Sequence, residues 1–436
     1  MKLPGWLSAA IEILNEIDTR RQPAKHALSE WGRANRYAGS KDRAAIGNLV
    51  YDALRQRASL AYIMQDESPR ALTLAVAVHQ WGESPDSLAG LFQADKFAPA
   101  PLTAGEQNHL TQDAEAVLKE APLWVQANIP EWVAPRFEAQ FGESLVEEGK
   151  AMAQRAPLDI RTNSLKANRE KLAKALKKYG PEVSNLAPEG LRLPPSIRAK
   201  KAPNIEAEAA HGKGWFEVQD IGSQIACQCT GVQAGDQVLD FCAGAGGKTL
   251  ALSAMMENKG QIHAYDHDKQ RLRPIFERLK RAGCRNVQTH EAGNVAALTQ
   301  LEGAMDVVLV DAPCTGTGTW RRHPDAKWRL SEQALETRKN EQQTVLESAV
   351  KYLKPEGRLV YVTCSLLEEE NEDQQAELMK NNPTLKPRPV GEIWDKSGND
   401  QKETPPAING TETSLTLTPA RHETDGFFIA ALQNRA

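Results

Sequence analysis

Apolar residues near the start of the chain recur at the spacing of a helix. Between positions 46 and 54 they fall at i, i+3, i+4, i+7 and i+8, on one helix face: Ile46, Leu49, Val50, Ala53 and Leu54. Asp42 lies just ahead of this run, where its carboxylate can accept hydrogen bonds from the free N–H groups of a first turn. Similar stripes occur over residues 7–17 and 72–81. The pattern predicts an all-α region over about the first 120 residues.

Helical periodicity stops in a passage rich in Pro and Trp, residues 122–135, which predicts a boundary. Residues 137–155 have a helical pattern again. Residues 158–163 then alternate like a strand, residues 170–179 suit a lysine-rich amphipathic helix, and residues 191–193 suit a short strand. These last three segments predict a small α+β module.

From residue 215 onward, short apolar runs alternate with helical stretches such as 269–281 and 331–352. The predicted strands are residues 237–241, 261–265, 286–290, 305–311 and 358–364. This alternation predicts an α/β fold with a parallel, doubly wound, Rossmann-like sheet, which binds ligands at the carboxyl ends of its strands.

The end of the chain changes pattern once more. Residues 396–412 are polar and predict a loop, and residues 415–417 and 427–432 suit a closing antiparallel hairpin. Three domains are therefore expected in the chain: an all-α domain, a small α+β module and an α/β domain. Their predicted ranges are residues 1–135, 136–212 and 213–436.

A glycine-rich turn follows the first predicted strand of the α/β domain, over residues 240–249. Such a turn brings backbone N–H groups close to a ligand. A P-loop would need glycine at Cys242, and a dinucleotide-binding turn would need its third glycine at Thr249, so neither spacing fits. An acidic start followed by G-x-G is the turn that S-adenosylmethionine enzymes have. An ordinary strand-to-helix turn is the alternative interpretation.

Further polar residues lie where other predicted strands end. Asp266 follows the second strand, where a carboxylate typically accepts hydrogen bonds from ribose hydroxyls. Asp311 and Cys314 follow the fourth strand and Cys364 ends the fifth. Since these two strands are expected to be neighbours, both thiols should face one cleft, together with Asp311 and Lys248. A buried structural role is the alternative for each thiol taken singly.

A thiol beside a methyl donor suits methylation of a pyrimidine at C5. C5 is a poor nucleophile until a thiolate adds to C6 and creates an enamine. An acid near N3 stabilises the charge that builds on the ring, and the thiol leaves by β-elimination after C5 loses its proton. The spacing does not decide which cysteine attacks.

Length, composition and cysteine usage limit the class of protein and the cell compartment. The chain has 436 residues, a net charge of −4 and 41% hydrophobic residues, which is typical of a soluble protein of several domains. No apolar run is long enough to span a membrane, and Glu12 and Glu16 argue against a secretory signal. The six cysteines are scattered, which favours a reducing cytosol, and Cys227 and Cys229 suit buried thiols better than metal ligands.

Charge is unevenly distributed along the chain. Residues 155–213 hold thirteen Lys or Arg against six Asp or Glu. A local basic surface on an acidic protein can guide a polyanion such as RNA. The alternative is that these lysines and arginines only form the solvent-exposed face of a helix and bind nothing.

Four motifs resemble those of the NOL1/NOP2/Sun family of RNA 5-methylcytosine methyltransferases. They are Asp240–Thr249, the run from Asp311 through Pro-Cys314 to Gly318, the Arg321-Arg-His-Pro-Asp325…Trp328 segment, and Thr363-Cys-Ser followed by Glu368-Glu-Glu-Asn371. The resemblance covers about residues 155–432. The N-terminal region is similar to the NusB-like RNA-binding domain in the bacterial Sun (RsmB) branch of that family.

The resemblance implies that Cys364 is the nucleophile and that Cys314 assists product release. It implies that Asp311 and Lys248 serve the target base and the cofactor pocket. The implied S-adenosylmethionine contacts are Cys242, Ala243, Gly244, Ala245, Gly246, Gly247, Lys248, Asp266, Asn294 and Asp311. The family usually has Gly-Asp where this chain has Gly293-Asn294, so an amide replaces a carboxylate there.

The expected function is methyl transfer from S-adenosylmethionine to C5 of a cytidine in RNA, with 16S ribosomal RNA as the expected substrate. We expect a cytoplasmic monomer without metal or membrane contact. Three alternatives stay open: the same chemistry on transfer RNA, a non-catalytic RNA-binding assembly factor, and an exocyclic-amine methyltransferase. The last usually places an aromatic residue where this chain has Cys314.

Overall fold

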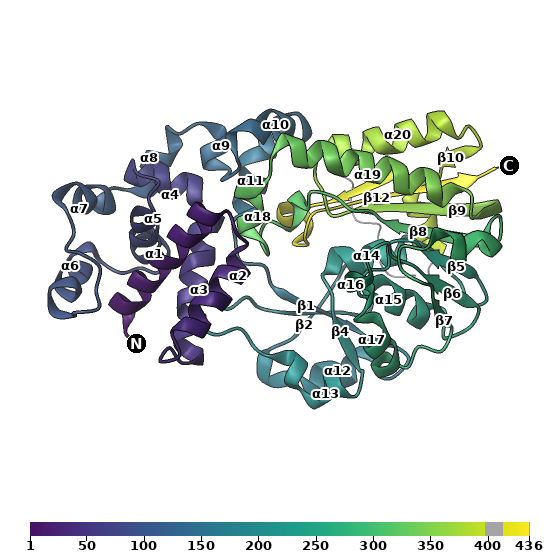
Figure 1. Ribbon diagram of the computed structural model, residues 1–436, viewed down its shortest axis with the longest axis horizontal. Coiled ribbons are helices and arrows are strands. Elements are labelled where there is room, and N and C mark those ends of the chain that lie inside the picture. Colours follow the sequence, from purple (N-terminus) through teal and green to yellow (C-terminus); the bar gives the residue numbers. More distant parts are fainter. Residues whose placement is uncertain (397–412, 436) are drawn as a thin grey trace. The chain divides into compact units, whose positions relative to one another are not determined.

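The computed structural model describes residues 1–396 and 413–435 (Figure 1). Its contacts divide the chain into two compact units. The first, here called the helical unit, comprises Met1–Ala156, Pro195–Pro203 and Thr319–Leu330. The second, here called the α/β unit, comprises Pro157–Pro194, Asn204–Gly318 and Ser331–Ala436. Each unit is described by itself, and the three-domain division stays a prediction.

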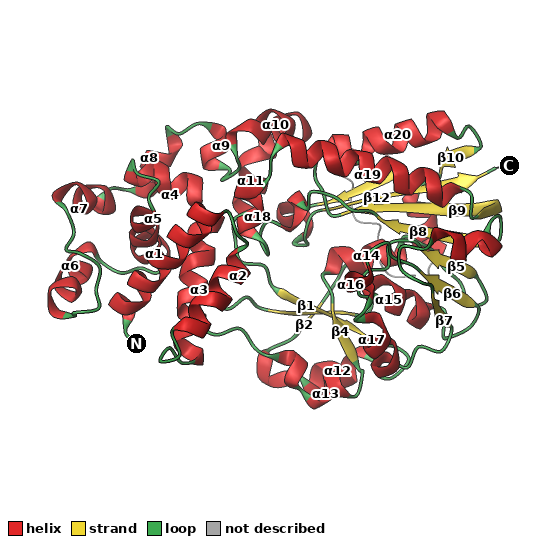
Figure 2. Ribbon diagram, in the orientation of Figure 1, coloured by secondary structure: helices red, strands yellow, loops and turns green. Residues whose placement is uncertain are grey.

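The helical unit contains no strand among its described residues, as Figure 2 shows by colour. Its α-helices are α1 (Leu3–Arg20), α2 (Ala24–Ala34), α3 (Ser40–Arg55), α4 (Arg57–Met64), α5 (Pro69–Ala75), α6 (Pro85–Ala94), α7 (Ala104–Thr111), α8 (Ala114–Lys119), α9 (Leu123–Gln126), α10 (Ala134–Phe141), α11 (Leu145–Met152) and α18 (Pro324–Arg329).

The predicted stripe of residues 46–54 lies on α3, and its five apolar residues are all buried. Asp42 acts as expected at the start of that helix, because its Oδ2 accepts the N–H of Gly39 at 3.1 Å. The stripe predicted over residues 72–81 begins on α5, but Val76–Gln80 forms a π-helical turn instead of a continuous α-helix.

A segment distant in sequence completes the helical unit. Trp320 is fully buried and stacks on Phe137 of α10, with ring centroids 5.4 Å apart. The indole Nε1 of Trp328 donates to the carbonyl of Leu54 at 2.6 Å. Lys327 is buried and donates to the carbonyl of Asn128 at 2.6 Å. Residues 319–330 therefore pack as part of the helical unit although they follow the fourth predicted strand.

The α/β unit begins with a four-stranded antiparallel sheet in the order β2-β3-β1-β4. Its strands are β1 (Leu158–Thr162), β2 (Glu182–Val183), β3 (Gly190–Leu193) and β4 (Phe216–Val218), and the nearby helices are α12 (Arg169–Ala175) and α13 (Ala209–Gly212). The two predicted strands of this module are confirmed, and the lysine-rich helix predicted over residues 170–179 is present but ends at Ala175, after which Lys177–Tyr179 forms a 3-10 turn.

The large sheet has the order β10-β12-β9-β8-β5-β6-β7, with β11 paired to β12. Its strands are β5 (Gln237–Asp240), β6 (Gln261–Ala264), β7 (Val287–Thr289), β8 (Met305–Asp311), β9 (Leu353–Thr363), β10 (Leu385–Pro387), β11 (Ser414–Leu417) and β12 (Phe427–Asn434). Strands β5 to β9 are parallel, and β10, β11 and β12 pair antiparallel. The five predicted parallel strands and the antiparallel end are confirmed, whereas the predicted loop 396–412 falls, except for its first residue, outside the described residues.

Helices cover both faces of this sheet (Figure 2). They are α14 (Ile221–Gln228), α15 (Gly247–Met255), α16 (Lys269–Leu272), α17 (Ile275–Ala282), α19 (Glu332–Val350), α20 (Glu372–Asn381), α21 (Val390–Lys396) and α22 (Pro419–His422).

Side chains along the central strands alternate between two cores, as the pleat requires. Val307 and Leu309 pack in the core that includes residues of α14 and α15, whereas Val308 and Val310 pack in the core that includes residues of α19. The doubly wound arrangement predicted from the sequence is therefore confirmed. The single helix predicted over residues 269–281 is two helices, because Pro274 has no N–H to continue the ladder.

Candidate active site

The glycine turn joins the end of β5 to the start of α15. Gly244 and Gly246 have φ of 49° and 84°, in the left-handed region that favours glycine. A Cβ added to Gly246 would lie 2.5 Å from the side chain of Ile275, so a larger residue does not fit there. Ala243 donates its N–H to the carbonyl of Tyr265, which fixes the turn against the end of β6.

Asp266 joins two loops at this edge of the sheet. It is 3% exposed, its Oδ2 accepts the N–H of Gly244 at 2.8 Å, and its Oδ1 accepts the N–H of Asp268 at 2.8 Å. Each carboxylate oxygen can accept a further hydrogen bond. These acceptor oxygens fit the ribose of S-adenosylmethionine, whose hydroxyls are donors.

Asp240 is the last residue of β5, just before the glycine turn, and its side chain is buried. Its Oδ2 accepts the hydroxyl of Thr249 at 2.6 Å, and its Oδ1 has no hydrogen-bond partner among the described residues. Burial raises the pKa of Asp240 to about 7. This hydrogen bond ties the end of β5 to the first turn of α15, and burial of the carboxyl group costs desolvation energy.

Lys248 and Asp311 form an ion pair between α15 and the end of β8, with Nζ and Oδ2 2.6 Å apart. Only 9% of the Lys248 side chain is exposed, and its Nζ lies 5.6 Å from the centre of the Phe427 ring. Burial lowers the pKa of Lys248, but the Asp311 carboxylate, together with Cys227 and Cys364, outweighs burial and leaves that pKa above its ordinary value. The sequence analysis missed the contact with Phe427.

The structure brings the two cysteines of the motifs together. Cys314 follows β8 and Cys364 follows β9, which is the parallel neighbour of β8, and the two Sγ atoms are 3.3 Å apart. Both residues are partly exposed. The hydrogen bond to Cys364, and after it burial, raise the pKa of Cys314 well above the ordinary thiol value. One thiol of the pair thus donates to the other sulfur.

Buried polar side chains support these cysteines, and sequence reasoning assigned them no role. They are Gln342 of α19 with Glu370 and Asn371, which lie between β9 and α20, and each is 0% exposed. We call these three residues the buried polar triad. The run Glu368-Glu-Glu-Asn371 belongs to one of the four motifs, and this glutamate and asparagine a few residues after Thr-Cys-Ser are the available sign in the sequence.

The remaining predicted cofactor residues have varied surroundings. Cys242 is partly exposed, and burial of its thiol raises the pKa well above the ordinary value. Ala245 accepts a hydrogen bond from Arg278 at its carbonyl, 2.8 Å away. A Cβ added to Gly247 would meet no atom within 4 Å. Asn294 is exposed and donates to Glu291 at 2.8 Å, so its contact with the cofactor stays a prediction.

The basic stretch is less exposed than its composition suggests. Arg161 is 5% exposed and donates to Gln219, and Arg192 pairs with Asp159 at 2.7 Å. Arg155 belongs to the helical unit. The exposed charge of this stretch therefore includes lysines around α12, among them Lys174, Lys177 and Lys178.

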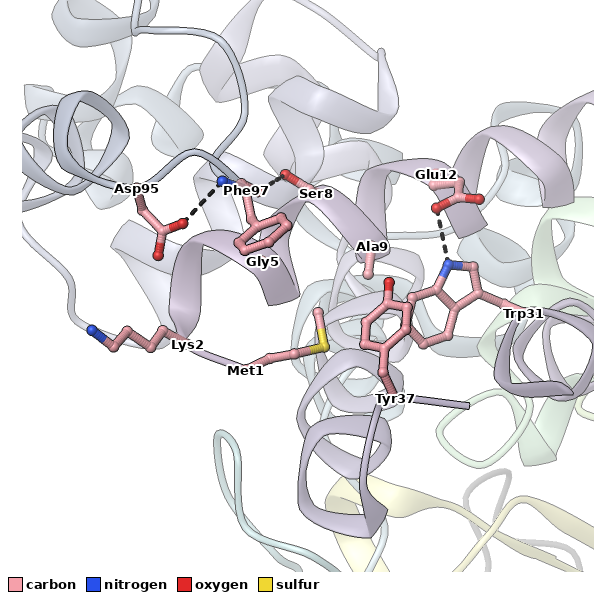
Figure 3. A pocket seen from close by; sticks show the side chains of 10 residues that line it. All are labelled: Met1, Lys2, Gly5, Ser8, Ala9, Glu12, Trp31, Tyr37, Asp95 and Phe97. Atoms are coloured by element: carbon pink, nitrogen blue, oxygen red, sulfur yellow. Dashed lines mark hydrogen bonds between the residues drawn. The ribbon is translucent and has the colours of Figure 1, made fainter. Parts of the chain in front are cut away.

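Among the described residues, no group of three or more His, Cys, Asp or Glu is placed to bind a metal ion, and no helix is both long and apolar enough to cross a membrane. A cavity of about 410 Å3 lies within the helical unit (Figure 3). Trp31 and Tyr37 line it and meet edge to face, and the indole of Trp31 donates to Glu12 at 2.9 Å. None of the predicted catalytic or cofactor residues lines this cavity.

A parallel sheet with a glycine turn after its first strand and a carboxylate after its second is a nucleotide-cofactor fold, and it fits an S-adenosylmethionine-dependent methyltransferase. A family model described as 16S rRNA methyltransferase RsmB/F matches residues 228–433. A second, described as an RsmF/B-like ferredoxin-like domain, matches residues 129–198.

Individual relatives agree with these matches. The chain is 31% identical to the probable ribosomal RNA small subunit methyltransferase B of Synechocystis sp. over 76% of this chain and 71% of the relative. It is 30% identical to ribosomal RNA small subunit methyltransferase B of Klebsiella pneumoniae over 91% of both chains. The crystal structure of a methyltransferase homolog protein from Pyrococcus horikoshii matches with a TM-score of 0.58 and 29% identity, over 72% of this chain and 97% of that one.

The chain therefore belongs to the RsmB/F family of 16S rRNA methyltransferases. It is an enzyme that uses S-adenosylmethionine as its methyl donor.

Proposed function

We propose that this protein transfers a methyl group from S-adenosylmethionine to C5 of a cytidine in 16S ribosomal RNA through a covalent intermediate on Cys364. The observation that carries the proposal is the pair of thiols 3.3 Å apart at the ends of two adjacent parallel strands. Charged groups lie beside it, since Lys248 is paired with Asp311 and its pKa is raised in part by Cys364.

The chemistry follows from the low nucleophilicity of C5 in a pyrimidine, which cannot take a methyl group directly. The Cys364 thiolate adds to C6, and the electron pair of the C5–C6 double bond makes C5 nucleophilic. C5 then takes the methyl group, and the sulfonium donor leaves as S-adenosylhomocysteine. Loss of the C5 proton to a base returns an electron pair to the ring, which breaks the C6–S bond and frees Cys364. Cys314 lies against the departing sulfur and assists this last step.

The other predicted residues serve recognition in this proposal. The Lys248–Asp311 pair faces the target base, where a proton shared with N3 stabilises the charge that develops on the ring. The glycine turn of residues 243–247 and the carboxylate of Asp266 hold S-adenosylmethionine. The target cytidine has to leave its stack to reach the thiols.

Ribosomal RNA is proposed as the substrate because the relatives from Synechocystis sp. and Klebsiella pneumoniae carry that substrate in their names. The exposed lysines around α12 are proposed to contact RNA phosphates. An enzyme acting on ribosomal RNA is expected in the cytoplasm, and a monomer is sufficient for the proposed chemistry.

Nucleoside mass spectrometry of methylated RNA tests this function. We expect 5-methylcytidine to form when the protein and S-adenosylmethionine are incubated with unmodified 16S ribosomal RNA, and not when Cys364→Ala replaces the native protein. Parallel incubation with unmodified transfer RNA tests the other substrate. Formation of N4-methylcytidine, or of no methylated cytidine in either RNA, would contradict the proposal.

A further inference from the structure

The buried polar triad bonds to the residues on both sides of each cysteine. Before Cys314, the carbonyl of Pro313 accepts the amide Nε2 of Gln342 at 2.9 Å. After it, the N–H of Thr315 donates to Oε1 of Glu370 at 2.8 Å, and the Thr315 hydroxyl donates to Oε2. The loop that carries Cys314 is therefore fixed from two sides.

Cys364 has an equivalent set of bonds. Before it, the hydroxyl of Thr363 donates to Oδ1 of Asn371 at 2.6 Å. After it, the hydroxyl of Ser365 donates to Oε2 of Glu370 at 2.5 Å, and its carbonyl accepts the Asn371 amide at 3.1 Å. Glu370 is the member of the triad whose carboxylate reaches the residue after each of the two cysteines. Its position therefore sets the separation of the two sulfur atoms.

The donors around Glu370 favour its ionised form. Oε1 receives two amide N–H groups, from Thr315 and, at 3.0 Å, from Gln342, and an amide N–H can only donate. Oε2 receives the two hydroxyls of Thr315 and Ser365. Burial outweighs the bonds from Ser365, Thr315 and Gln342, which act in the opposite direction, and leaves the pKa of Glu370 above its ordinary value. A carboxylate with four donors keeps its negative charge more readily than one buried without them.

The two thiols consequently have different charged neighbours. The negative charge of Glu370 acts on Cys314 and disfavours its thiolate, in the same direction as burial. The positive charge of Lys248 instead interacts with Cys364. The other titratable groups near the pair are Tyr361, whose hydroxyl donates to the carbonyl of Glu370, together with Glu372 and Asp311.

We propose that Glu370 is a positioning residue that fixes the two thiols relative to each other and leaves the proton of the pair on Cys314. The proposal rests on the proposed function, in which Cys364 attacks the base. The S–H of Cys314 donates to the sulfur of Cys364 and stabilises negative charge on it twice, before attack on C6 and again when the C6–S bond breaks. The charge of Glu370 thus separates the roles of two chemically identical side chains.

The test is the pH dependence of thiol alkylation in the full chain, without RNA or S-adenosylmethionine. Initial rates of iodoacetamide addition to Cys314 and Cys364 are measured by peptide mass spectrometry between about pH 6 and 11, a range that extends well above the ordinary thiol pKa. The midpoint of each rate profile reports the pH at which that thiol ionises. A difference in how easily iodoacetamide reaches the thiol changes only the maximum rate. In the unsubstituted protein, Cys364 should react with a midpoint at lower pH than Cys314.

Substitution of Glu370 separates charge from shape. Glu370→Gln keeps the size and one acceptor oxygen, which can still receive the N–H groups of Thr315 and Gln342, and replaces the other oxygen with an NH2 group that the hydroxyl oxygens of Thr315 and Ser365 can accept. It removes the charge, so the Cys314 midpoint should fall and the preference for Cys364 should shrink about tenfold, the effect of one pKa unit. Glu370→Asp retains the charge and should retain most of the preference. Glu368→Gln makes the same change at an exposed position two residues away and should leave both profiles unchanged.

Two outcomes would overturn the proposal. One is a folded Glu370→Gln protein with both midpoints unchanged. The other, which needs no variant, is a lower midpoint for Cys314 than for Cys364 in the unsubstituted protein. Failure of the proposed function would be distinguishable, because absence of 5-methylcytidine in the RNA assay leaves the alkylation profiles as they are.

Discussion

The cofactor end and the thiol end of the site are built in different ways. At the cofactor end, one contiguous turn adopts left-handed glycine conformations, and a single side chain, Asp266, ties it to the next loop. At the thiol end, two cysteines fifty residues apart in sequence come within 3.3 Å, and Gln342, Glu370 and Asn371 hold their flanking residues. The first arrangement is local and depends on the backbone, whereas the second depends on buried side chains from several elements.

Because the two ends are built separately, a substitution should be able to impair cofactor binding or methyl transfer without impairing the other. A change at the thiol end should stop chemistry and leave cofactor binding intact. A change at the cofactor end should weaken binding and leave the thiol pair in place. The following predictions test that separation, beginning with the largest expected effect.

Cys364→Ala should lower the rate of methyl transfer by roughly 10⁴-fold or more, since removal of a nucleophile eliminates the covalent route. Single-turnover transfer of a labelled methyl group to 16S ribosomal RNA measures the loss. Calorimetry with S-adenosylmethionine should give the affinity of the native protein. A variant that still methylates C5 at a comparable rate would show that Cys364 is not the nucleophile.

Asp240→Asn should change how stability depends on pH. The pKa of Asp240 is raised to about 7 in the folded chain, against 3.8 for the ordinary group. The folded state therefore binds more protons than the unfolded state between these values, so the stability contributed by Asp240 is present below about pH 4 and is lost as the pH rises through about 7.

The neutral amide at position 240 should remove this dependence. At pH 8 the variant should be more stable than the native protein, by about 1–3 kcal/mol. Urea unfolding of both proteins at several pH values measures the difference, and Asp236→Asn, at a more exposed carboxylate before β5, serves as the control. A difference between native and Asp240→Asn that stays constant from pH 5 to pH 8 would contradict the raised pKa.

Asp266→Ala should weaken S-adenosylmethionine binding by about 1–3 kcal/mol, the scale of a lost hydrogen bond to a charged group. Both the proposed ribose contact and the bond to Gly244 disappear in this variant. Isothermal titration calorimetry measures the affinity, and the alkylation profiles of Cys314 and Cys364 should stay as in the native protein. An unaltered affinity would remove Asp266 from the cofactor site.

Reversal of charge at Lys174, Lys177 and Lys178 should have the smallest effect per residue. If these lysines contact phosphates, replacement by Glu should reduce the slope of log K against log salt concentration by up to about 3. Lys178 pairs with Glu208 at 2.8 Å, so its share should be smaller than that of the other two. Filter binding to 16S ribosomal RNA at several salt concentrations gives the slope, and an unchanged slope would place the RNA contacts elsewhere.

Much of the α/β unit could be predicted because its determinants are local. The five parallel strands are short apolar runs separated by helical patterns, and β8 matched its predicted residues 305–311 from end to end. The meeting of Cys314 and Cys364 followed from one topological rule, that consecutive strands on this side of the sheet are neighbours.

The features that the sequence did not predict depend on tertiary contacts. Nothing in the pattern around Trp320 and Lys327 indicates that residues 319–330 pack within the helical unit, because their partners Phe137 and Asn128 lie about 200 residues earlier in the chain. The arginines 161 and 192 counted toward a basic surface, but their partners Gln219 and Asp159 make them internal. Glu370 looked like one of three consecutive surface glutamates, and only the fold shows which of them is buried.

The central claim is that Cys364 attacks and Cys314 assists release, and a covalent trap tests it most directly. Cys314→Ala and Cys364→Ala are each incubated with S-adenosylmethionine and 16S ribosomal RNA and analysed on a denaturing gel. The account predicts a nuclease-sensitive protein–RNA band with Cys314→Ala, because elimination is slowed after the bond to C6 has formed. The same band with Cys364→Ala would exchange the two roles, and its absence from both variants would contradict the covalent mechanism.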